Sequence, residues 1–181
     1  MMMTVKVISE DTLSNSFLGN TKQICLVSRD IYRTMKGLVT LGIGPWRVYT
    51  FGPGTVTDMT YMGKPSNHSM RLALAMSGDM LWEVIQPLEG KSIYTDFLDE
   101  HGEGIHHVAP ACEALSYAQQ IKKFEALGYK NIQSGVWNER VPFCYYDSEG
   151  DISTTIEIFD IPEDMAMPDP EEWYPAPPPV S

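Results

Sequence analysis

Residues 81–87 read LWEVIQP, and residues 155–162 read TIEIFDIP. Apolar side chains surround one glutamate in each stretch, Glu83 in the first and Glu157 in the second. Because side chains two positions apart share one face of a strand, each stretch predicts a β-strand that carries a carboxylate among apolar neighbours. The likeness of the two stretches indicates an internal duplication.

The elements before each stretch follow the same order. A strand comes first, then a helix that ends at a Leu-Gly pair, and then three strands, of which the quoted stretch is the last. The first copy has these elements at 22–28, 31–41, 46–51, 70–76 and 80–86. The second copy has them at 105–112, 114–127, 131–135, 143–147 and 153–160. A repeat that occurs only twice favours two paired βαβββ modules over a solenoid.

Four segments follow from this order. We expect an N-terminal arm at residues 1–19, the first module at 20–92, a linker helix with the second module at 93–161, and a Pro-rich acidic tail at 162–181. The tail holds seven of the 13 prolines, and two interpretations of it stay open. It is either an extended segment that wraps the domain through Trp173 and Tyr174 or a disordered end.

The composition and the cysteine content favour a globular cytoplasmic protein. Hydrophobic residues make up 43% of the chain and charged residues 20%, which is typical of a packed domain. The formal net charge of −11 repels phosphate backbones and anionic lipids, so we expect no nucleic-acid or membrane partner. We find no apolar run of membrane-spanning length, no secretory signal and no CxxC pair among the three cysteines.

Four polar residues occupy matching positions in the two copies. Gln23 and His107 lie in the two first strands, and Glu83 and Glu157 lie midway in the two last strands. Any one of them alone would more often be solvated, but two carboxylates among apolar neighbours need a partner, because an unpaired buried charge costs several kcal/mol. A shared cation would satisfy both. We therefore predict one divalent metal ion held by these four residues, and the donor set suits Zn, Ni, Co, Mn or Fe(II).

The segment FLDEHGEGIHHV (97–108), preceded by WEVIQPLEGKS (82–92), resembles the vicinal-oxygen-chelate superfamily, in particular its glyoxalase and methylmalonyl-CoA epimerase branch. The resemblance covers about residues 20–161. It implies an α+β fold in which two βαβββ modules form a cupped eight-stranded mixed sheet with helices on the outside. It also implies the same four metal ligands, in a set similar to that of glyoxalase I. Members of the family often form homodimers, sometimes by exchanging modules, and we expect a homodimer here.

The resemblance implies a metal-dependent lyase or isomerase, including epimerases. Such enzymes move a proton next to the carbonyl of a small substrate and stabilise an enolate-like oxyanion on the metal. We expect Glu157 to be the principal base and Glu83 a second carboxylate, with Asp58 as the other candidate in the first module. His106 alternates with His107 along the strand, so we expect it to be a packed or hydrogen-bonded neighbour.

Residues near these strands predict an apolar pocket for the substrate. We expect Trp46, Tyr145 and Phe159 to contact it, together with Arg71 if that face of its strand is concave. An apolar or aromatic carbonyl compound would fit such a pocket. The chain shows no arginine cluster for the glutathione carboxylates of a glyoxalase I substrate.

Two alternatives come from the same superfamily. Extradiol dioxygenases bind Fe(II) with two histidines and one glutamate, and Glu83 takes the place of one of those histidines here, which disfavours oxygen activation. The other alternative is a metal-free protein that binds or sequesters a small molecule, as resistance proteins do. The complete set of four ligands argues against it.

Overall fold

The computed structural model describes residues 17–111 and 115–179. Most of the expected N-terminal arm therefore lies outside the described residues. The helices are α1 (Ile31–Thr40), α2 (Ile93–Glu100), α3 (Tyr117–Ala126) and α4 (Glu149–Ile152). The strands are β1 (Thr21–Val27), β2 (Trp46–Phe51), β3 (Val56–Tyr61), β4 (Lys64–Pro65), β5 (Met70–Ser77), β6 (Met80–Pro87), β7 (Gly104–Pro110), β8 (Asn131–Trp137), β9 (Val141–Tyr146), β10 (Thr155–Phe159) and β11 (Glu172–Tyr174).

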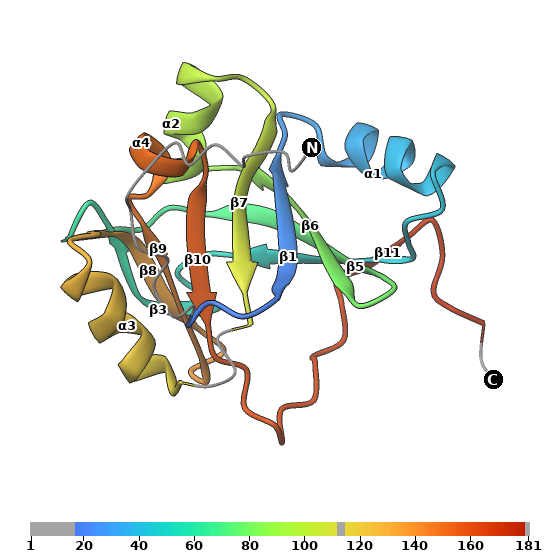
Figure 1. Ribbon diagram of the computed structural model, residues 1–181. Coiled ribbons are helices and arrows are strands. Elements are labelled where there is room, and N and C mark those ends of the chain that lie inside the picture. Colours follow the sequence, from blue (N-terminus) through green and yellow to red (C-terminus); the bar gives the residue numbers. More distant parts are fainter. Residues whose placement is uncertain (1–16, 112–114, 180–181) are drawn as a thin grey trace, which may run out of the picture.

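All strands join one mixed sheet in the order β11-β2-β5-β6-β1-β7-β10-β9-β8-β3-β4 (Figure 1). The two first strands, β1 and β7, pair antiparallel at its centre. Each is flanked by the last strand of its own copy, because β1 pairs parallel with β6 and β7 pairs parallel with β10. The two predicted βαβββ patterns are therefore present, and the α+β fold with a mixed sheet is confirmed.

The described residues form a sheet of 11 strands, whereas we expected eight. The three additional strands, β3, β4 and β11, lie at its two ends. β3 leaves the first copy and pairs antiparallel with β8 of the second, with Val56 opposite Trp137. β4 forms a short hairpin with β3, and β11 in the tail pairs antiparallel with β2. The first copy and the tail therefore complete both edges of the duplicated sheet.

Helix α1 covers the face of the sheet that turns away from the candidate site. Asp30 caps its N-terminus, where the carboxylate accepts a hydrogen bond of 3.0 Å from the Arg33 backbone N–H. Ile31 and Met35 are fully buried on the side of α1 that packs against Trp46, Val84 and nearby alanines. In Figure 1, α1 and α3 lie at opposite ends of the sheet. These contacts determine which face of the sheet α1 covers, and the opposite face holds the second core.

A larger core fills the opposite, concave side. Its buried members come from both copies and from the linker helix α2, and they include Phe51, Leu72, Tyr94, Trp137 and Phe143. Phe51 stacks on Trp137 with ring centroids 4.9 Å apart, so β2 of the first copy meets β8 of the second. Among the helices formed by residues 17–111 and 115–179, none is long and apolar enough to span a bilayer.

A substitution at Gly135 in β8 tests the packing of β3 against the second copy. A Cβ atom at this position would lie 2.7 Å from Val56 Cγ1 and 2.9 Å from Phe143 Cζ. We expect Gly135→Ala to lower the free energy of unfolding by about 1–3 kcal/mol, the usual cost of overpacking a core. Urea denaturation monitored by tryptophan fluorescence measures this change.

The matched control is Gly37→Ala in α1, where a Cβ atom would have no neighbour within 4 Å. Because alanine favours a helix over glycine by up to about 1 kcal/mol, this variant should be as stable as the parent or more so. Equal stability of the two variants would contradict the packing described for β3.

Candidate metal centre

The register of the central strands brings the four predicted ligands to one face of the sheet. Cys25 of β1 lies opposite Glu83 of β6 on one side and opposite His107 of β7 on the other. Gln23 precedes Cys25 by two positions, and Glu157 follows Thr155, the partner of His107, by two. Since residues two apart share a face and directly paired residues do as well, these side chains all point into the cup.

The four side chains meet at one buried point. The Gln23 amide nitrogen donates hydrogen bonds of 2.8 Å to Glu157 Oε2 and 3.1 Å to Glu83 Oε2. His107 Nε2 lies 3.1 Å from each of the same two carboxylate oxygens. None of these residues is more than 5% exposed, and His107 is fully buried. The structure therefore brings together the whole predicted set.

Burial and charge oppose each other within this cluster. Burial raises the pKa of the Glu157 carboxyl above its usual range, even though the neighbouring His107 lowers it. Burial alone would lower the pKa of His107, but the Glu157 and Glu83 carboxylates outweigh it and raise that pKa to about 9. Positive charge is thus stabilised at the point between the two carboxylates, which is what a cation site requires.

His106 supports the imidazole of His107 from behind. The Nδ1 atoms of the two rings are 2.8 Å apart. Burial lowers the pKa of His106 well below its usual value, and His107 lowers it further. This favours the tautomer in which a neutral His106 ring accepts the hydrogen bond and His107 Nδ1–H donates it. The rings of Tyr94 and Phe97 pack edge-on against His106. A ligand histidine held in this way keeps one ring nitrogen directed at the metal position.

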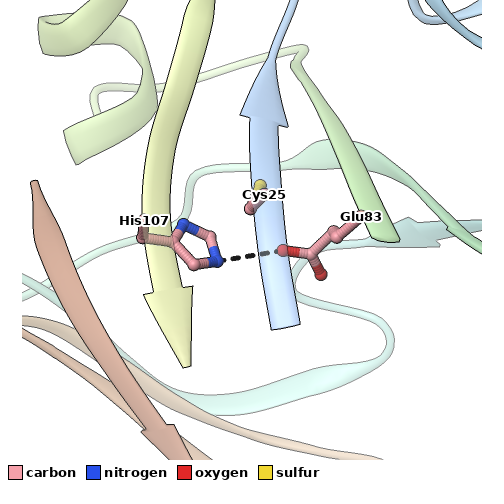
Figure 2. Close-up of side chains that lie close together, drawn as sticks. All are labelled: Cys25, Glu83 and His107. Carbon is pink, nitrogen blue, oxygen red and sulfur yellow. Dashed lines mark ion pairs between the residues drawn. The ribbon is translucent and has the colours of Figure 1, made fainter. Parts of the chain in front are cut away.

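Cys25 is a further candidate donor that we did not predict as a ligand. Its sulfur lies within 4.8 Å of donor atoms of Glu83 and His107, and Figure 2 shows it between them on β1. Burial raises the pKa of the thiol well above its usual value, and the Glu83 carboxylate raises it further. One sequence pattern could have predicted this position: Cys25 lies two residues after Gln23, so the two side chains share one face of the strand.

An apolar cavity opens in front of the cluster. Its volume is about 80 Å³, and Gln23, Glu83 and Glu157 form its polar end. Tyr145 and Phe159, two of the predicted substrate contacts, line it. Its remaining walls are apolar and come from both copies and from the tail: Phe51, Met70, Leu72, Leu74, Leu81, Trp137, Val141, Phe143, Ile161 and Met167.

The other predicted contacts lie elsewhere. Trp46 is fully buried against α1 on the opposite face of the sheet. Arg71 lies 3.4 Å from Glu172 and donates to the Tyr32 hydroxyl, because the even-numbered residues of β5, and not the odd-numbered ones, face the cavity. Neither residue lines the cavity, and both assignments are corrected. Asp58, the alternative base, is solvent-exposed and absent from the cavity lining.

The donor set fits a divalent cation. Two carboxylates, an imidazole and a primary amide are ligands that Zn, Ni, Co, Mn and Fe(II) accept. The Gln23 nitrogen now lies between the carboxylates, and a half-turn of the amide would present its oxygen at the same point. Gln23, Glu83, His107 and Glu157 are the residues that would hold the ion.

Comparison with known families agrees with this architecture. A family model described as "Glyoxalase/Bleomycin resistance protein/Dioxygenase superfamily" matches residues 22–145, which is more than half of the chain. The chain belongs to this superfamily. Membership confirms the resemblance to the vicinal-oxygen-chelate proteins that the sequence motifs indicated. No curated protein matches the sequence of this superfamily member significantly.

Several solved structures share its fold. The hypothetical protein BH1468 from Bacillus halodurans C-125 has a TM-score of 0.57 and 18% identity, over 82% of this chain and 98% of the other. Methylmalonyl-CoA epimerase from Mycobacterium tuberculosis has a TM-score of 0.58 and 14% identity, over 82% and 91%. A Streptomyces coelicolor methylmalonyl-CoA epimerase variant in complex with 2-nitronate-propionyl-CoA has a TM-score of 0.52 and 13% identity, over 78% and 96%. Identities this low establish the fold and not the activity.

The raised pKa of His107 predicts how the stability of chelator-treated protein depends on pH. The folded pKa of about 9 lies above the ordinary value of 6.5, so protonated His107 stabilises the fold fully below pH 6.5, and this contribution is lost as the pH rises through about 9. At about 1.4 kcal/mol per pKa unit, we expect the free energy of unfolding to fall by roughly 3 kcal/mol over this interval.

Urea unfolding at a series of pH values measures the slope. In His107→Gln the titrating imidazole is absent, so the slope between these pH values should flatten. A His107→Gln variant with the slope of the parent would show that another group is responsible.

Proposed function

We propose that this protein is a metal-dependent lyase or isomerase, of which an epimerase would be one form. It would remove or transfer a proton at the carbon next to a carbonyl group. The observation that supports this most directly is the convergence of Gln23, Glu83, His107 and Glu157 on one buried point at the end of an apolar cavity. A divalent ion, when bound there, supplies Lewis acidity toward a carbonyl oxygen.

Glu157 is the proton acceptor in this proposal. It lines the cavity, so it reaches a molecule bound there, and burial raises its pKa toward the range in which a carboxylate takes up a proton efficiently. Tyr145 lies directly opposite Glu157 in the register of β9 and β10 and lines the same cavity. Its hydroxyl accepts a hydrogen bond of 2.8 Å from Tyr94, which fixes the ring. Glu83 is a second carboxylate on the other side of the cluster.

The cavity walls favour an apolar or aromatic carbonyl substrate. Aromatic and aliphatic side chains surround the polar end, and they exclude water from the reacting atoms. Exclusion of water strengthens every charge interaction with the substrate, because the local dielectric constant is low. The proposal includes a homodimer located in the cytoplasm.

Metal binding is the first test. Chelator-treated protein titrated with Zn, Ni, Co or Mn in a calorimeter should bind one ion per chain. Glu83→Gln, His107→Gln and Glu157→Gln should each weaken binding by at least about tenfold, since loss of even an outer-shell partner has that effect. Glu139→Gln, which changes an exposed glutamate in the β8–β9 turn, should bind as the parent does.

The same titration separates two donor sets. If the ion lies among Gln23, Glu83, His107 and Glu157, then Cys25→Ala keeps the parental affinity and Glu157→Gln loses it. The reverse pattern would support the Cys25, Glu83 and His107 set. A parent protein that binds no divalent ion, yet binds an apolar small molecule in the cavity, would support the metal-free binding protein instead.

Proton transfer is the second test. Metal-loaded protein in deuterium oxide should incorporate deuterium next to the carbonyl of an apolar or aromatic ketone, as measured by mass spectrometry. Removing a positioned general base typically costs about 10²–10⁴ in rate, so Glu157→Gln should lose exchange to that extent. Glu83→Gln, assayed at saturating metal, should retain it. Equal exchange rates in the two variants would remove Glu157 from its assigned role.

A further inference from the structure

A second pocket, the outer groove, adjoins the cavity. It has a volume of about 360 Å³. Leu74, Leu81, Ile161 and Met167 line both the cavity and the outer groove, so the two spaces share one apolar wall. A molecule that occupies both spaces would place one end near Glu157 and the other end in the groove.

The cationic residue of the outer groove is Arg47. It lies on β2 opposite Leu74 of β5 and opposite Trp173 of β11, and it is solvent-exposed. Alternation along β2 places Arg47 on the same side as Tyr49 and Phe51, which belong to the concave core. Its guanidinium carbon lies 5.3 Å from the centroid of the Trp173 ring. The cation and the ring together form one wall of the groove.

Arg47 differs from the other arginines in its partners. Arg33, Arg71 and Arg140 each pair with a carboxylate, and Arg29 donates to the Leu98 carbonyl. Within residues 17–111 and 115–179, Arg47 has no carboxylate at ion-pair distance. Its guanidinium lies over the Trp173 ring as a cation–π contact instead. In a chain with a net charge of −11, an arginine beside an apolar groove without such a partner leaves its positive charge available to an external anion.

The acidic residues next to Trp173 are engaged outside the groove. Glu171 accepts hydrogen bonds from the Thr50 backbone N–H and side chain, and Glu172 accepts one from the Tyr32 hydroxyl and pairs with Arg71. These contacts anchor the tail along β2 and engage both carboxylates. Asp169 of the tail lies near Tyr49, on the same face of β2 as Arg47, but forms no ion pair with the Arg47 guanidinium.

We propose that the outer groove binds the far end of the substrate, and that this end carries an anionic group which Arg47 recognises. The substrate class is then an apolar carbonyl compound with a carboxylate, sulfonate or phosphate at the end remote from the reacting carbon. This assignment rests on the proposed function. Ile161, at the end of the second module, and the tail residues Met167 and Trp173 build much of the groove, and all three lie beyond residues 22–145, where the family model matches.

Two fluorescent probes with the same aromatic skeleton test the proposal. Anilinonaphthalene sulfonate is anionic, and phenylnaphthylamine lacks the sulfonate. We expect the parent protein to bind the anionic probe about three- to tenfold more tightly, which is the range of a partly exposed charge-assisted contact. Arg47→Gln should abolish this preference, and Arg47→Glu should reverse it, while both variants bind the neutral probe as the parent does.

The controls separate this proposal from the proposed function. Arg33→Gln, which removes an exposed arginine on α1, should keep the parental preference. Neither probe is a substrate, so the preference is measured without proton transfer and does not depend on the proposed activity. Retention of the preference in Arg47→Gln, or no preference in the parent, would overturn the proposal. With a ketone acid that undergoes exchange, Arg47→Gln should raise KM and leave kcat unchanged, and a fall in kcat alone would also overturn it.

Discussion

Two carboxylates removed from water at the centre of the sheet are the constraint on which the rest of the structure depends. Glu83 and Glu157 are each only 5% exposed, and an unpaired charge at such depth costs several kcal/mol. Gln23 and His107 provide the hydrogen-bond donors between them. Each donor contacts both carboxylates, so loss of either one would weaken the compensation of both buried charges, and the strands that carry these residues must keep their relative positions.

The duplication solves this problem by sharing the cluster between the halves. Each half supplies one donor and one carboxylate, and the antiparallel pairing of β1 with β7 brings the two pairs together. A slip of one residue in this pairing would turn Gln23 or His107 to the opposite face, where the apolar core beneath α1 lies. Register, charge balance and core packing therefore select the same arrangement, and neither half can complete the cluster alone.

Much of this arrangement could be predicted from the sequence, because it depends on short-range patterns. The alternation of apolar residues predicted the strands of both copies and placed the four polar residues on one face. Long-range pairing could not be predicted. The paired residues of β3 and β8 lie 72 to 81 positions apart in the sequence, and no local pattern marks this pairing. Arg71 was misassigned for a similar reason, since alternation divides a strand into two faces but only tertiary packing decides which one is concave.

The segment between β10 and β11 forms part of the wall of the cavity in front of the buried cluster. The sides of the cavity are strands held by ladders on both flanks, and β3 ties the outer edge of one half to the other. Ile161 and Met167 lie between β10 and β11, in a stretch that belongs to no strand within the described residues. These two residues are therefore the part of the cavity wall that no strand ladder restrains, so a displacement of this stretch would widen the cavity without breaking a strand pairing.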